Sequence, residues 1–266
     1  MAKHRFAVFS ILSAALCAGT GGTLLADECY DRNVPAPCET VGPQTPRDIL
    51  NRLGENPVRF SKAPPMRELR LCDIHFHRSA ENKIPGSVPA IPPGEGFVCT
   101  QMKGATAHDA EGEGADRKVC QNVGLFDTVE VHWVYTTCNV EPAPCLTSCF
   151  SPSCLNPELR VAAQVFFLTP NGYPRATDWQ ESGYDHYPPP PNGNVEFLGS
   201  TTGDKFNRPG PNNCSPYQAT WSVARSCRPL TLASLGRWCD TNVYNERKPH
   251  GVRKLVTDPK LLARIP

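Results

Sequence analysis

The chain has 266 residues, and its 27 Lys and Arg against 26 Asp and Glu give a formal net charge of +1. A balance so close to neutral gives no electrostatic signature of nucleic-acid binding or of an anionic membrane surface. With 28 Pro, 20 Gly and 8% aromatic residues, the composition favours a loop-rich fold with short strands over a helical bundle.

The N-terminus has the layout of a secretory signal peptide. Residues 3–5 are basic, and an apolar stretch covers about 6–17. Small residues follow up to Ala26, after which we expect cleavage. The apolar stretch is shorter than the ~20 residues that a membrane span requires. We therefore predict a signal peptide over 1–26, a single secreted or periplasmic domain over 27–266, and no integral membrane span.

Cysteine usage agrees with export. Thirteen cysteines are present, and removing Cys17 with the signal peptide leaves twelve, an even number. In an oxidising compartment such a set indicates a disulfide framework, whose pairing the spacing leaves open. A rival interpretation is a second zinc site at Cys145, Cys149 and Cys154, but this spacing is loose and thiolates oxidise in exported proteins.

Several segments carry the period-two alternation or the β-branched enrichment of strands. They predict a mainly β fold (β-dominated α+β), with a largely antiparallel central sheet and long loops tied by disulfides. In chain order, the predicted elements are a short helix at 47–53, a strand at 68–77, a Gly/Pro loop at 85–117, a strand at 128–136, a cysteine-rich excursion at 138–154, a buried strand at 159–168, an extended proline-rich loop at 184–191, strands at 195–198 and 218–224, and a short helix near Leu261.

Two of the predicted strands carry histidines on one face. Because successive side chains of a strand point to opposite faces, His75 and His77 share a face with Asp73. In the second strand, Glu130 and His132 share a face. If the strands are neighbours, three imidazoles converge and leave one position of a tetrahedral zinc ion open, as in a catalytic site. The two acids are placed to accept the outer N–H of a ligating histidine.

Other metal patterns fit the sequence less well. A metallo-hydrolase of the His-x-His-x-Asp-His type needs an Asp where the chain has Ser79. A cupin-like site would use Glu81, but the Pro-x-Gly expected before the histidine of its second motif is missing before His132. The remaining histidines lie in signal or loop segments and are expected to be solvated surface imidazoles: His4, His108, His186 and His250.

The run Cys-Asp-Ile-His-Phe-His-Arg-Ser-Ala-Glu-Asn-Lys at 72–83, with Glu-Val-His-Trp-Val-Tyr at 130–135, resembles the delta-class carbonic anhydrases and their bacterial relatives. It is also similar to the alpha class, where a His-Phe-His strand and a Glu-x-His strand supply the ligands. Gly-Ser-Thr-Thr at 199–202, Cys214 and a later Trp-Ser-Val extend the likeness over about 68–230. Here no proline follows the second threonine, and a long insertion precedes the cysteine.

The resemblance implies a fold similar to that of the alpha class and a carbonic anhydrase that uses Zn²⁺ as its cofactor. His75, His77 and His132 would be the ligands. Zinc-bound hydroxide would hydrate CO2 reversibly to bicarbonate and a proton, since zinc lowers the pKa of its bound water to about 7. Asp73 and Glu130 would orient the ligands. No second cofactor is implied.

The resemblance also implies a path for protons. Thr201 is the candidate hydroxyl that orients the nucleophile, and Glu81 is the candidate carboxylate behind it, although Glu81 could instead form a surface ion pair with Lys83. The alpha family takes its proton shuttle from a histidine ahead of the first ligand strand, and the mature chain has none there. Three alternatives stay open: His108 or His186 serves instead, buffer takes the proton directly, or turnover is modest.

The pocket for CO2 would include Val134, two residues past His132 on the same face, together with Thr202 and either Ala163 or Val165 of the buried strand. CO2 and bicarbonate are the only partners that the pattern predicts, and the oligomeric state stays open. Two other functions also stay open. One is a secreted module in which zinc only staples the fold, and the other is a cupin-like metal-dependent oxidoreductase.

Overall fold

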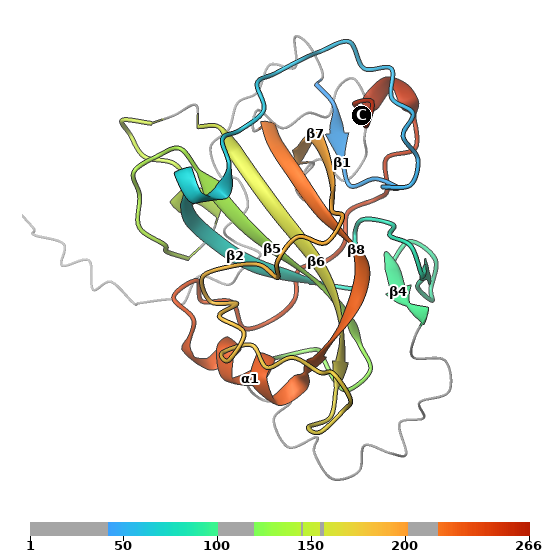
Figure 1. The fold of residues 1–266 in the computed structure, drawn as a ribbon, viewed down its shortest axis with the longest axis vertical. Helices are drawn as coiled ribbons and strands as arrows, with labels where there is room; N and C mark the ends of the chain where they lie inside the picture. The colour runs from blue at the N-terminus through green and yellow to red at the C-terminus, as the bar shows by residue number, and fades with distance from the viewer. Residues whose placement is uncertain (1–41, 101–119, 145, 155–156, 202–217) are drawn as a thin grey trace, which may run out of the picture.

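The computed structural model describes residues 42–100, 120–144, 146–154, 157–201 and 218–266. Its centre is a six-stranded sheet in the order β1-β7-β8-β6-β5-β2 (Figure 1). The pairs β2–β5, β5–β6 and β7–β8 are antiparallel, whereas β6–β8 and β1–β7 are parallel. The predicted mainly β fold with a largely antiparallel central sheet is confirmed.

The strands of this sheet vary widely in length. They are β1 (Gln44–Thr45), β2 (Arg70–Arg78), β5 (Thr128–Thr136), β6 (Leu159–Thr169), β7 (Val195–Thr201) and β8 (Gln218–Thr231). A separate two-stranded sheet pairs β3 (Ser87–Pro89) with β4 (Phe97–Cys99). The helical elements are α1 (Leu232–Thr241) and three 3-10 turns, η2 (Met66–Glu68), η6 (Leu146–Cys149) and η8 (Pro259–Leu261).

The predicted strands at 128–136 and 159–168 match β5 and β6, and the other predicted strands also fall on observed ones. The helix predicted at 47–53 is wrong. The Ile49 N–H donates to the Lys83 carbonyl and the Lys83 N–H donates to the Arg47 carbonyl, so this backbone pairs with a distant segment and not along a helix. Sequence reasoning also missed α1, β3 and β4.

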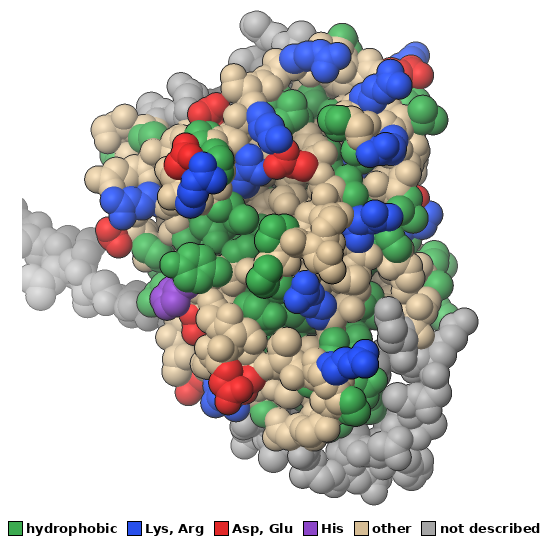
Figure 2. Space-filling view, viewed as in Figure 1, with side chains coloured by type: hydrophobic (Ala, Val, Ile, Leu, Met, Phe, Trp, Pro, Cys, Tyr) green, Lys and Arg blue, Asp and Glu red, His purple; other side chains and the backbone are tan. Residues whose placement is uncertain are grey.

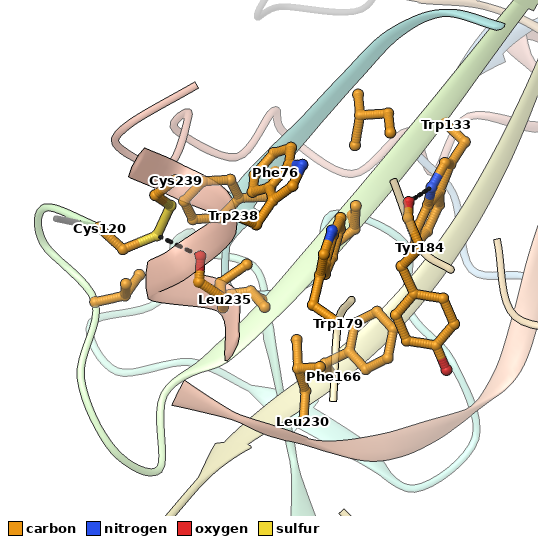
Figure 3. Packing of buried hydrophobic residues seen from close by; sticks show 14 of the residues in the cluster. Phe76, Cys120, Trp133, Phe166, Trp179, Tyr184, Leu230, Leu235, Trp238 and Cys239 are labelled. Carbon is orange, nitrogen blue, oxygen red and sulfur yellow. Dashed lines mark hydrogen bonds between the residues drawn. A yellow bond between two sulfur atoms is a disulfide. The ribbon is translucent and has the colours of Figure 1, made fainter. Parts of the chain in front are cut away.

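One face of the sheet is covered by an aromatic core (Figure 3). The Trp179 ring stacks on Trp133 at 5.8 Å and lies 4.7 Å from the ring of Trp238 on α1. Phe76 of β2 packs edge-on against Trp238 at 6.1 Å. Trp133 Nε1 donates to the Tyr184 carbonyl at 2.8 Å, which satisfies the one polar atom of that ring. This aromatic layer therefore holds β2 and β5 in place on one face of the sheet.

The opposite face combines a second apolar cluster with buried polar side chains. Val134, Val161, Val165 and Trp221 belong to the cluster, and all are at most 4% exposed. The same face of β2 and β5 carries the predicted histidines and acids, since side chains alternate along each strand. The histidines therefore lie on a wall that valine side chains and Trp221 build.

Four disulfides join loops and strands of the described residues. They are Cys72–Cys149, Cys99–Cys227, Cys120–Cys239 and Cys138–Cys154. The rival zinc site at Cys145, Cys149 and Cys154 is thereby contradicted, because two of its three thiols are oxidised in separate disulfides. Such a framework is typical of proteins of oxidising compartments. The remaining cysteines lie outside the described residues: Cys17, Cys29, Cys38, Cys145 and Cys214.

The surface is mixed in character. Figure 2 shows Lys and Arg side chains scattered over one face with Asp and Glu side chains among them, and hydrophobic side chains gathered left of centre. Among the described residues, no helix combines the length and the apolar character that a membrane crossing needs.

Candidate metal centre

The register of β2 against β5 builds the predicted histidine cluster. His75 lies directly opposite His132, and His77 follows two residues later on the same face of β2. One ligand atom from each of the three residues lies within 4.8 Å of the other two, so the group could hold a metal ion. The convergence predicted from strand parity is confirmed.

Two of the imidazoles have a nitrogen within hydrogen-bond distance of an oxygen acceptor, whereas His132 Nε2 is buried without a hydrogen-bond partner. His75 Nδ1 lies 2.6 Å from the Asp73 carboxylate, and His77 Nδ1 lies 3.0 Å from the Gly251 carbonyl. His132 Nε2 lies 3.4 Å from Glu130 Oε1, beyond good hydrogen-bond geometry. Because a carbonyl oxygen only accepts, the proton of a neutral His77 is on Nδ1. The nitrogens left over are Nε2 of His75, Nε2 of His77 and Nδ1 of His132.

These remaining nitrogens suit a single ion. His75 Nε2 and His132 Nδ1 are 3.2 Å apart, and two ligand nitrogens at ~2.0–2.1 Å from one tetrahedral zinc lie about 3.3 Å from each other. His77 Nε2 is buried with no hydrogen-bond partner. A buried polar atom without a partner is costly, and a metal ion would supply one. The donor set therefore fits zinc.

The electrostatics keep two of the ligands neutral. Burial lowers the pKa of His77 well below its usual value, and the neighbouring imidazoles lower it further against the opposing effect of Glu81. Burial and then His75 likewise lower the pKa of His132. A metal ligand must be a neutral imidazole, so these rings are ready to bind at neutral pH.

A β-bulge lies directly before Asp73 in β2. Leu71 pairs with Tyr135 and Asp73 pairs with Val134, so Cys72 is the extra residue between two successive pairs. Asp73 itself lies on the histidine face because it is two residues before His75 in the regular part of the strand, and the bulge shifts the register of the residues before it. The disulfide from Cys72 to η6 fixes the bulge. Nothing in the sequence pattern reveals this irregularity.

Glu81 is buried and held by Arg253. It accepts from the Arg253 backbone N–H and Nε, each at 2.8 Å, and from Nη2. Burial acts to raise the pKa of Glu81, but the Arg253 guanidinium and then His77 outweigh it, so this pKa lies far below its usual range. The surface pair of Glu81 with Lys83 is wrong, because Lys83 pairs with Asp48 at 2.6 Å.

Glu130 is the second buried carboxylate. It accepts from the backbone N–H of Glu81 at 2.5 Å, from that of Asn82 at 3.1 Å, and from Asn82 Nδ2 at 2.9 Å. Burial, followed by the charge of Glu81, raises the pKa of Glu130 to about 7. The loop after β2 thus anchors Glu130 next to His132.

The predicted substrate wall is assembled around His132. Ala163 lies opposite His132 in the β5–β6 register and Val165 lies opposite Glu130. Val134 is 2% exposed on the same face. The Trp221 ring approaches the His132 ring edge-on at 5.2 Å, a contact that sequence reasoning did not foresee.

The predicted threonines lie at the limit of the described chain. The Thr201 backbone ends β7 and pairs with Thr45, while its side chain, Thr202 and His108 lie outside what the structure describes. His186 is exposed, as predicted. The same expectation for His250 is wrong: its side chain is only 15% exposed, and its ring lies 5.3 Å from that of His75.

Sequence reasoning missed the contribution of the C-terminal segment. Gly251 and Arg253 contact His77 and Glu81 although 174 and 172 positions separate the partners. A lone glycine carbonyl and an arginine in a polar tail carry no local signal. Only their pairing beside β2 reveals their place in the site.

Fold and site together define the class: a β-sheet protein with a three-histidine group that could hold one metal ion, backed by buried carboxylates. The family model for delta carbonic anhydrase matches residues 66–234, more than half of the chain. The chain belongs to the delta carbonic anhydrase family, and it is a carbonic anhydrase.

Two further comparisons add little. No curated protein matches the chain. Among solved structures, Photobacterium profundum alpha-carbonic anhydrase is 15% identical with a TM-score of 0.34, over 85% of this chain and 89% of that chain. A similarity of that TM-score carries no argument about the site.

Proposed function

We propose that the chain is a zinc-dependent carbonic anhydrase that hydrates CO2 reversibly to bicarbonate and a proton. His75 and His77 would bind the ion through Nε2 and His132 through Nδ1. The observation that carries this proposal is the convergence of three imidazoles, two of which hydrogen-bond an oxygen acceptor through their other nitrogen while the third has Glu130 Oε1 3.4 Å away. When bound, zinc supplies a Lewis acid that activates water near neutral pH.

The residues around the ligands would hold them in one tautomer. Asp73 and the Gly251 carbonyl accept from Nδ1 of His75 and of His77, which directs both Nε2 atoms to the ion. Glu130 faces the outer nitrogen of His132. Such contacts fix ring orientation and raise ligand basicity.

Thr201 and Glu81 remain our candidates for the proton relay. The Glu81 carboxylate is buried, ionised and 3.4 Å from His77 Nδ1, so an acceptor stands close to the ligands. The Thr201 hydroxyl would donate a hydrogen bond to the Glu81 carboxylate and accept one from the nucleophile. Thr202 would lie behind it.

The apolar wall would hold CO2 beside the ion. Val134, Ala163 and Val165 are almost fully buried on the histidine face. CO2 is small and has no net dipole, so a short aliphatic surface receives it without taking a charged group out of water. Bicarbonate, which is charged, would leave from such a surface readily.

Export would deliver the protein to an oxidising compartment. The four disulfides are consistent with a secreted or periplasmic location. Cleavage after Ala26 would release residues 27–266 as one domain. N-terminal sequencing of the exported protein tests this boundary.

CO2 hydration by stopped flow, with zinc content measured on the same samples, tests the proposal. We expect one zinc per chain and a hydration activity that rises as the pH passes through neutral. His132→Ala should lose both the zinc and the activity. His186→Ala, which removes an exposed imidazole, is the matched control for zinc content and should keep its ion. A zinc-replete protein with no hydration activity would leave zinc as a structural staple and overturn the proposal.

A further inference from the structure

The free edge of β2 is closed by a segment near the C-terminus. β2 is the last strand of the sheet, so backbone groups on its outer side need partners elsewhere. The N–H of Phe76, which lies between the first two ligands, donates to Glu246 Oε1 at 3.2 Å. Its carbonyl accepts from the His250 N–H at 2.8 Å. The His250 carbonyl then accepts from the Arg78 N–H at 3.2 Å.

At Phe76, between the two ligand histidines of β2, a carboxylate thus takes the place of a neighbouring strand as the hydrogen-bond acceptor. The Glu246 residue is only 3% exposed. A hydrogen bond to an ionised acceptor is about twice as strong as one between neutral groups, and few water molecules can reach a group so buried. The bond from Phe76 therefore restrains the peptide that joins His75 to His77.

Glu246 also holds the His250 ring. His250 Nε2 lies 3.1 Å from Glu246 Oε1 and 3.3 Å from Oε2. The His250 ring packs against two ligand rings, with centroids 5.3 Å from His75 and 5.6 Å from His77. The His250 ring thus borders both imidazoles.

The backbone of Glu246 is itself connected to the end of α1 through the side chain of Asn242. The Asn242 side chain donates to the Glu246 carbonyl at 2.8 Å and accepts from the Glu246 N–H at 2.9 Å. The same amide donates to the Trp238 carbonyl at 2.9 Å, at the end of the helix. A rigid connection therefore runs from the aromatic core through Asn242 to the edge of β2.

We propose that Glu246 and His250 are positioning residues for the metal ligands. Glu246 fixes the backbone between His75 and His77, and His250 fixes the planes of their rings. This inference rests on the proposed function, because it assumes that these histidines bind zinc. It adds two residues to the part of the site that lies beyond residue 234, where the family match ends.

Direct metal binding tests the inference without an activity assay. The full chain and the variants Glu246→Gln, His250→Phe and the double variant are titrated with zinc against a chromophoric chelator. The cobalt(II)-loaded forms are compared by visible absorption, which reports ligand geometry at the ion. Glu246→Gln keeps an acceptor for Phe76 but loses the charge, and His250→Phe keeps the ring but loses its hydrogen bond.

We expect each single variant to bind zinc about 10- to 100-fold more weakly, as for other partners of metal ligands, with a shifted cobalt spectrum. The double variant should be weaker than either single one, but by less than the sum of the two losses, since the residues share the Glu246–His250 contact and also act separately on the backbone and on the rings. Glu196→Gln is the control. Glu196 forms ion pairs with Lys62 and Arg160 and contacts none of the histidines or their carboxylate partners, so the variant should bind zinc as the wild type does.

The outcomes separate this inference from the proposed function. A wild-type chain that binds no zinc overturns both. A wild-type chain that binds zinc, with Glu246→Gln and His250→Phe unchanged in affinity and in cobalt spectrum, overturns the positioning role alone. Variants that lower the thermal stability of the zinc-free protein but keep the wild-type zinc affinity and cobalt spectrum would limit Glu246 and His250 to a role in folding and overturn the positioning role.

Discussion

The two faces of β2 and β5 differ sharply although the same strands build both. On one face, Phe76 and Trp133 enter an aromatic core with Trp179 and Trp238 (Figure 3). On the other, the residues next to them in the chain are the ligand histidines, and Asp73 and Glu130 lie on the same face. Burial of apolar side chains on the first face stabilises the fold. Burial of charged groups on the second face destabilises it.

The comparison shows how a costly polar site can be kept in place. Each ligand is bonded through the backbone to a residue that is locked in the apolar layer, so the core limits the movement of the histidines. Interiors are close-packed and transmit displacement. Substitutions on the aromatic face should therefore lower stability, while those on the histidine face should alter pH dependence and metal binding.

The largest effect is expected on the aromatic face. Trp133→Ala should lower the free energy of unfolding of the zinc-free protein by about 4 kcal/mol, because it opens a large cavity and removes the hydrogen bond to Tyr184. Urea denaturation measures this. Trp133→Phe, which fills most of the space, should cost clearly less; equal losses for the two variants would contradict the packing argument.

Arg253→Met should cost about 3 kcal/mol at pH 7, since it leaves the Glu81 charge buried and unpaired. In the wild type the pKa of Glu81 is depressed, so its contribution is present above the ordinary carboxyl value and is lost as pH falls through the folded value. In the variant, burial instead favours the protonated form.

The deficit of Arg253→Met should therefore shrink as pH falls from 7 towards 4.5. Urea denaturation of both proteins at the two pH values measures it. The variant Arg253→Met/Glu81→Gln is the control and should recover most of the lost stability at pH 7. A deficit that stays the same at both pH values would show that Glu81 is not the charge responsible.

Asp73→Asn should weaken zinc binding by about 10- to 100-fold, or about 1.4–2.7 kcal/mol. The amide cannot serve as a charged acceptor for His75 Nδ1, which lies 2.6 Å from the carboxylate. Chelator competition measures the affinity. Asp178→Asn, which changes a carboxylate paired with Arg237, should bind zinc as the wild type does.

The smallest effect is expected at the surface. Arg237→Ala breaks the pair with Asp178, whose nitrogen and oxygen lie 2.5 Å apart while the arginine side chain is 55% exposed. Water and salt screen such pairs, so the free energy of unfolding should fall by less than about 1 kcal/mol. Thermal unfolding measures this, and a loss near that of Arg253→Met would remove the contrast between exposed and buried pairs.

Strand parity predicted the site because the ligands are close in sequence and the period of a strand is two. His75, His77 and His132 needed only two neighbouring strands. The same rule placed Glu130 and Val134 on the histidine face. The strands β5 and β6 were predictable because β-branched and aromatic residues fill them.

What the sequence did not predict depends on contacts between distant parts of the chain. The segment at 47–53 looks helical in isolation, but its backbone pairs with Lys83. Glu246, His250 and Arg253 reach β2 only because the C-terminal segment runs along the strand edge. Non-local pairing of this kind leaves no periodic signal in either partner.

X-ray absorption at the zinc edge of the zinc-loaded protein tests the central claim most directly. The account predicts one zinc per chain with three imidazole nitrogens at about 2.0–2.1 Å and one further oxygen ligand. It also predicts that His132→Ala loses this signal. Sulfur ligands at about 2.3 Å, or an unchanged spectrum in His132→Ala, would contradict the account.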